Sequence, residues 1–196
     1  MIEIVEKRQD WDNVLQQIGN YDFYHTYGYH RIMAKEGELP ILIHYVSGDV
    51  QIAFPFLRRS VDGQYHDLTS VHGYLGPIGR GAGAVYGNGA FSSAFQELMV
   101  EEGIVSAFSK LNPFIRYQDR FLQSMGTIEN IGELVYFDQT MEDAPQLSQY
   151  NRNTRQSLKK LQRLAYVREA DGPGDIQNFI EIYHRTMDRL NANKIF

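Results

Sequence analysis

Six basic residues and no acidic residue lie between Ala144 and Arg168, although the whole chain carries a net charge of −5. Arg152, Arg155 and Lys159 recur at helical spacing, so they share one face of a predicted amphipathic helix. Surface helices usually mix both signs to gain pairs between residues four apart. An unbalanced cationic ridge suits phosphate groups, which arginine binds with two hydrogen bonds. We therefore take Arg152, Arg155 and Lys159 as candidate phosphate-binding residues, with a solvated helix face as the alternative.

A second candidate is the stretch 72–89, which has seven glycines in eighteen residues. Glycine lets the backbone approach a ligand closely, and His72 and Tyr74 stand among these glycines. The stretch has neither the GxGxxG spacing nor a Walker lysine, so it carries no nucleotide-binding fingerprint. We take His72 and Tyr74 as candidate substrate-binding residues, and a wide turn is the alternative interpretation.

Several classes of chemistry lack their residues in this sequence. There is no cysteine, and the six histidines form no HExxH pair, so neither a cysteine nucleophile nor a metal site is predicted. No GxSxG elbow of a serine hydrolase occurs. The negative net charge argues against general affinity for DNA. No stretch approaches the roughly 18 apolar residues of a membrane span, and no signal core opens the chain, so we expect a cytoplasmic protein.

The elements that position these candidates can be predicted from hydrophobic periodicity. Residues before 144 alternate between period-2 and helical patterns, bounded by Gly and Pro. This order predicts an α/β (α+β) fold with a mixed, mainly antiparallel sheet flanked by helices. The expected strands are 2–5, 41–47, 50–59, 66–71, 104–111 and 132–140, and the expected helices are 10–18, 23–37, 90–102 and 114–122.

The residues from 144 onward have a different character. A basic helix over 147–165, a short strand at 166–169 and a last helix from Asp175 are predicted, so we place a domain boundary at 143. The last helix carries apolar residues with no later sheet to cover them, which indicates that the sequence ends inside a second unit. We expect this apolar face to be covered by another copy of the chain or left partly exposed, and a homo-oligomer through the C-terminal segment is a candidate assembly.

Three segments together resemble the FemABX family of peptidoglycan-bridge aminoacyltransferases in order and spacing, over most of the chain. They are the aromatic-rich helix HTYGYHRIMA, the loop VHGYLGPIG, and the basic helix NRNTRQSLKKLQRLAYVREA followed by FIEIYHRTMDRL. The resemblance implies two tandem acetyltransferase-like (GNAT) domains. Residues 1–143 would form the first, and residues 144–196 would form a linking basic helix and the truncated start of the second.

The resemblance also implies an activity and a site. Family members move an aminoacyl or acyl group from an activated donor, aminoacyl-tRNA or acyl-CoA, to an amine of a cell-wall or surface-polysaccharide precursor. The donor would be a phosphate-bearing co-substrate rather than a tightly bound cofactor. The cationic ridge, joined by Arg189 of the last helix, would border the substrate cleft together with His72 and Tyr74. Attack of a neutral amine on an ester or thioester needs positioning and an oxyanion donor, but no metal or cysteine.

Two alternatives remain open within this interpretation. Bridge-forming enzymes usually have Gln-Ser before the aromatic residue of the early helix and a lysine one turn later, whereas this chain has His25-Thr26 and Met33. A polysaccharide-type amine with an acyl-CoA donor is therefore the alternative to a nucleotide-linked cell-wall precursor. A non-catalytic binding or regulatory module, which keeps a GNAT-like cleft but lacks the donor-binding half, is the alternative function. The end of the sequence just after the last predicted helix is the feature that favours it.

Overall fold

The computed structural model describes residues 1–82 and 86–192. Its strands are β1 (Ile2–Val5), β2 (Leu39–Ser47), β3 (Val50–Ser60), β4 (His66–Thr69), β5 (Ile78–Arg80) and β6 (Ile104–Phe108). Its helices are α1 (Arg8–Ile18), the 3-10 turn η1 (Phe23–His25), α2 (Tyr27–Met33), α3 (Gly89–Glu101), α4 (Gln118–Leu122), α5 (Asp143–Ser148), α6 (Arg152–Leu164) and α7 (Pro173–Arg189).

The six strands form one mixed sheet, and most of its pairs are antiparallel. The strand order is β1-β2-β3-β4-β6, and β5 pairs with β3 beside this path. All pairs are antiparallel except β4 with β6, which run parallel. The predicted mixed α/β architecture with a mainly antiparallel sheet is therefore confirmed at this level.

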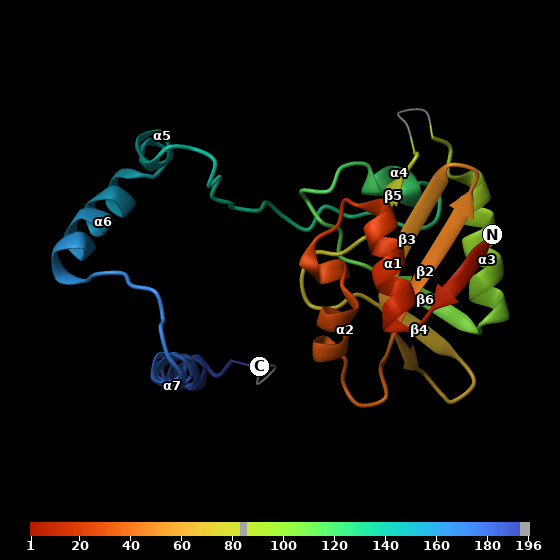
Figure 1. Cartoon of the computed structure of the whole chain (residues 1–196), viewed down its shortest axis with the longest axis horizontal. Coiled ribbons are helices and arrows are strands. Elements are labelled where there is room, and N and C mark those ends of the chain that lie inside the picture. The colour runs from red at the N-terminus through yellow and green to blue at the C-terminus, as the bar shows by residue number, and fades with distance from the viewer. Residues whose placement is uncertain (83–85, 193–196) are drawn as a thin grey trace. The chain divides into compact units, whose positions relative to one another are not determined.

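Helices cover both faces of the sheet (Figure 1). Alternate residues of the β2–β3 hairpin point to opposite faces. Ile43 lies opposite Phe54 and both pack with α3, whereas Leu42 and Ala53 pack with Trp11 of α1. The core thus has two layers of side chains, one on each face of the sheet.

Helix α1 forms because its apolar residues repeat at helical spacing, and all four of them are buried against the sheet. Gly19 ends the helix in the left-handed region, at φ 80°. The predicted start at Asp10 was wrong, because the helix begins at Arg8 with Lys7 as its N-cap.

Two other predictions in the first half needed correction. The expected helix 23–37 is divided into η1 and α2, because Thr26 has extended backbone and its side chain accepts the Tyr29 N–H at 3.3 Å as an N-cap. The glycine-rich stretch also contains a strand, since β5 pairs with residues 51–53 of β3. The part of that stretch at 83–85 lies outside the described residues.

The predicted strands 132–140 and 166–169 were wrong, since neither segment has strand structure. Alternating apolar residues form a strand only where a partner supplies hydrogen bonds, and Val135 is 86% exposed. The basic helix is also shorter than expected. It is divided into α5 and α6, and Asn151 caps α6 by accepting the Thr154 N–H at 2.9 Å.

The chain divides into a first unit, Met1–Leu134, and a second unit, Val135–Phe196. Every buried hydrophobic residue in the described part of the chain belongs to the first unit. Helices α5, α6 and α7 of the second unit bury no residue. No helix in the described ranges is long and apolar enough to cross a membrane.

Candidate functional site

The parallel strands β4 and β6 part at their carboxyl ends. Their ladder runs to Thr69 and Phe108, and an isolated bridge then joins Leu75 to Leu111. Residues 71–74 leave the ladder between these two points of attachment. The segment that contains His72 and Tyr74 is therefore a short loop fixed at both ends.

Aromatic side chains from η1 and α2 hold this loop on one side. The hydroxyl of Tyr29 donates to the carbonyl oxygen of His72 at 2.8 Å. Gly73 has φ 126°, and a Cβ at this position would overlap the ring of Tyr24. Only glycine fits both the backbone angle and the space, so the close approach of the Tyr24 ring explains this glycine.

Buried amides hold the other end of the loop. The side chain of Gln118 donates to the carbonyl oxygens of Leu75 at 2.7 Å and Pro77 at 3.1 Å, and it accepts the Asn112 N–H at 2.7 Å. Gly76 lies so close to Gln118 that a Cβ would overlap the amide. Since buried polar groups need partners, these bonds fix the loop's backbone.

Behind the loop, two buried histidines support the turn from η1 into α2. The Asp22 N–H donates to Nδ1 of His25 at 3.2 Å, and Nδ1 of His30 lies 3.0 Å from the Thr26 carbonyl oxygen. Both Nε2 atoms are buried without a hydrogen-bond partner among the described residues. Burial lowers the pKa of His25, and burial lowers the pKa of His30 to about 4. Both rings are therefore neutral at pH 7.

The rings near the loop form an aromatic cluster of Phe23, Tyr24, Tyr29 and Tyr74. Neighbouring rings of this cluster have centroids between 4.0 and 6.3 Å apart, and most are edge-to-face. The ammonium of Lys110 lies 4.9 Å from the centroid of Tyr74. This cation–π contact places a positive charge next to the loop.

A cavity of about 710 Å³ lies beside Tyr74, on the face of the sheet that α3 covers. Its ionisable lining residues are Tyr74, Lys110, Glu129 and Glu133. The rest of its lining is largely apolar and comes from β3, α3, β6 and the segments that follow β6 and α4. The lining includes Phe54, Phe56, Phe95, Ala107, Phe108, Leu122, Met125, Ile128, Ile131 and Leu134. Such a cavity can hold an apolar group with a charged group at the side of Lys110.

The structure places the two loop candidates differently. Tyr74 lines the cavity, whereas His72 does not, and its backbone carbonyl is the acceptor of the Tyr29 hydroxyl. The candidates chosen from the sequence did not include three residues around this loop: Lys110, Asn112 and Gln118. Lys110 lies inside the strand predicted over 104–111, whereas β6 ends at Phe108 and places Lys110 in the loop that follows, a usual place for functional residues. A lone lysine or amide has no periodic signal that would have revealed this.

The cationic candidates belong to the second unit. Arg152, Arg155 and Lys159 lie on α6 and are exposed, and Arg189 is the last residue of α7. Arg155 donates to the carbonyl oxygen of Ser148 at 3.4 Å. That these side chains border one cleft with His72 and Tyr74 stays a prediction.

Within the part of the chain that the structure describes, no three or more His, Cys, Asp or Glu residues are grouped as a metal site would require. Comparisons with protein-family models, curated proteins and solved structures found no significant match to this chain.

Proposed function

We propose that this chain is part of an acyltransferase with GNAT-like domains. It would move an acyl or aminoacyl group from acyl-CoA or aminoacyl-tRNA to an amine of a cell-wall or surface-polysaccharide precursor. The observation that carries the proposal is the cavity beside the parted ends of β4 and β6, with Tyr74 and Lys110 in its lining. An apolar cavity of this volume accommodates an acyl group, and a fixed loop with a nearby cation suits a polar, anionic donor.

The reaction requires the protein mainly to position the acyl donor and the amine. The amine nitrogen attacks the carbonyl carbon of the thioester or ester, and a C–N bond forms as the C–S or C–O bond breaks. The amine proton must leave, and Glu129 and Glu133 are the carboxylates on the cavity wall that are able to accept it. Lys110 and the cations Arg152, Arg155, Lys159 and Arg189 are proposed to bind phosphate groups.

The cavity assignment is tested with a pair of substitutions on one strand. Ala107 lines the cavity, whereas Val105, two residues earlier on β6, does not, and both are exposed. Ala107→Trp places a large ring in the cavity and should weaken binding of acyl-CoA measured by calorimetry, whereas Val105→Trp should leave it unchanged. Equal affinities in both variants would rule out the cavity as the acyl site. Transfer to glucosamine and to a peptidoglycan precursor, measured with labelled donor, then tests the reaction itself.

A non-catalytic binding or regulatory module is the second candidate function. The cavity lining contains no histidine among the described residues, and both of its carboxylates lie on the segment 126–134, which has no regular structure. Tight donor binding that is sensitive to Ala107→Trp, without transfer to any amine, would favour this candidate.

A further inference from the structure

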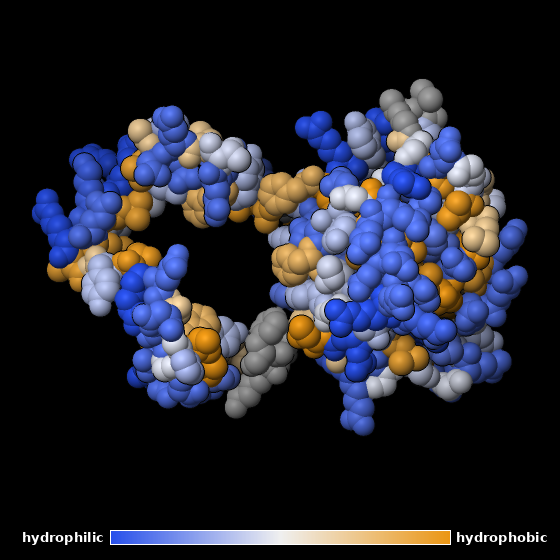
Figure 2. All heavy atoms as spheres, in the orientation of Figure 1, coloured by the Kyte–Doolittle hydropathy of each residue, from blue (hydrophilic) through white to orange (hydrophobic). Residues whose placement is uncertain are grey.

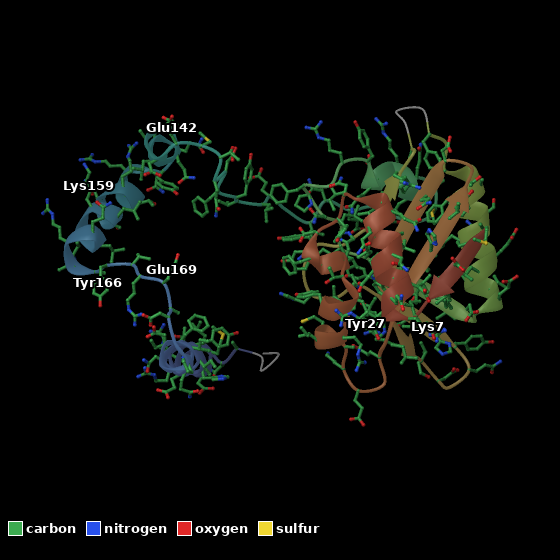
Figure 3. The ribbon with its side chains drawn as sticks, viewed as in Figure 1. Lys7, Tyr27, Glu142, Lys159, Tyr166 and Glu169 are labelled. Carbon is green, nitrogen blue, oxygen red and sulfur yellow. The ribbon has the colours of Figure 1, made fainter. Side chains whose placement is uncertain are left out.

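Helix α6 displays a set of cations that no carboxylate balances. Its five cations are all exposed and make no ion pair among the described residues; they are Arg152, Arg155, Lys159, Lys160 and Arg163. By contrast, Arg58, Arg59 and Arg168 each contact a carboxylate. Figure 3 labels Lys159 among these side chains. The cations of α6 are therefore available for an anionic partner.

The same helix carries a row of leucines on the side opposite the ridge. Leu158, Leu161 and Leu164 recur every three residues; Leu161 is 54% exposed and Leu164 is 73% exposed. Figure 2 shows hydrophilic and hydrophobic atoms together at the surface of this segment. A solvated helix face needs no such row, and RNA contacts use cations without a leucine row.

The helix has the local features needed to form on its own. Asn151 caps its start, and the Ala165 N–H donates to the Leu161 carbonyl oxygen at 2.8 Å at its end. With 13 residues it is about 20 Å long, and it carries five cations on one face and three leucines on the opposite face. A short helix with a broad cationic face and a narrow apolar face is the pattern of interfacial membrane helices.

We propose that α6 binds the surface of a bilayer that contains anionic phospholipids. The leucine row would enter the boundary between headgroups and acyl chains, and the cations would contact lipid phosphates. This inference names one source for the phosphates that the ridge is proposed to bind, and it does not depend on transfer activity. The whole chain has a net charge of −5, and the segment 144–168 alone carries +6. The rest of the chain therefore carries −11 and is repelled by such a surface. Membrane binding should therefore depend on α6.

The experiment is sedimentation of the full chain with large vesicles of phosphatidylcholine, with or without phosphatidylglycerol. We expect binding only to the anionic vesicles and a loss of binding at high salt. Each cation near an anionic surface changes affinity roughly fivefold, so Arg155→Gln with Lys159→Gln should weaken binding about 30-fold. Leu161→Ser should weaken binding to anionic vesicles at constant charge.

The matched control is Arg31→Gln with Lys35→Gln. These two exposed cations have the same spacing of four residues but lie in the first unit, so their removal should leave vesicle binding unchanged. Circular dichroism would check that each variant retains its helices. The proposal is overturned if the chain ignores anionic vesicles, or if both double variants lose binding equally. It is also overturned if Leu161→Ser has no effect while polyuridylate RNA displaces the chain from vesicles, because the ridge then binds phosphate chains rather than a bilayer.

Discussion

At the scale of single residues, the position of the loop 71–74 depends on a glycine without room for a side chain. Gly73→Ala adds a Cβ that overlaps the Tyr24 ring at a backbone angle, φ 126°, that alanine rarely adopts. We expect the free energy of unfolding to fall by about 2 kcal/mol. Urea denaturation measures this, with Gly28→Ala as the control.

Gly28 lies in α2 with nothing within 4 Å of an added Cβ. Alanine there should stabilise the protein by about 0.5–1 kcal/mol, because glycine loses more conformational freedom in a helix. If Gly73→Ala does not lower the free energy of unfolding, the Tyr24 contact does not constrain the loop.

A second residue, Gln118, satisfies three buried backbone groups at once. Gln118→Met keeps the shape of the side chain but removes every one of these hydrogen bonds. We expect a loss of about 2–4 kcal/mol in the free energy of unfolding, since unpaired buried groups keep their desolvation cost. Thermal unfolding of both proteins would show it. A change within experimental error would mean that water or another side chain replaces the amide.

At the scale of elements, η1 and α2 should make the fold sensitive to acid. The folded pKa of His30 is about 4, below its ordinary 6.5, because the ring is buried. Between these values the unfolded chain binds more protons than the folded chain. The contribution of the neutral His30 to the free energy of unfolding is therefore complete above pH 6.5, and it falls as the pH drops toward 4. For His30 the loss reaches about 3 kcal/mol.

Chemical denaturation at several pH values measures this dependence. His30→Gln should reduce the slope of the free energy of unfolding against pH between pH 6.5 and 4, whatever its effect at pH 7. Part of the slope should remain, because His25 is still present. His184→Gln replaces an exposed histidine and should leave the slope unchanged. A wild-type stability that is constant over this range would show that the histidines are accessible to protons.

Elements with local signals were predictable from the sequence, whereas those that need a distant partner were not. The β2–β3 hairpin, α3 and α7 have periodic patterns and turn residues within a few positions, and all of them form. Strand β5 has three residues and forms because β3 passes beside it, which no local pattern encodes. The same reason explains the failure at 132–140, where a strand pattern has no partner.

The residues of the candidate site also differ in whether a local sequence signal could reveal them. Tyr74 could be found because aromatic residues among glycines are conspicuous, and it does line the cavity. Lys110 and Gln118 act through the contacts they make with residues more than thirty positions away, at Tyr74 and Leu75. Such long-range contacts are a property of the folded chain rather than of sequence spacing.

At the scale of the whole molecule, core and charge are distributed unequally along the chain. Among the described residues, the buried hydrophobic ones run from Val5 to Phe121, and the exposed cations of α6 lie in the second unit. The apolar face of α7, predicted to be covered by another copy or left partly exposed, has Phe179 67% exposed and Leu190 62% exposed. Large apolar surfaces of this kind favour association.

We therefore expect the full chain to self-associate as its concentration rises. Burial of a phenylalanine contributes about 1.5–3 kcal/mol, so Phe179→Ser should weaken association by roughly tenfold or more. Sedimentation velocity over a wide range of concentrations measures the dissociation constant, and Gln177→Ser, a polar change on the same helix, is the control. A chain that stays monomeric throughout, or a dissociation constant that Phe179→Ser leaves unchanged, would show that α7 is not the contact surface.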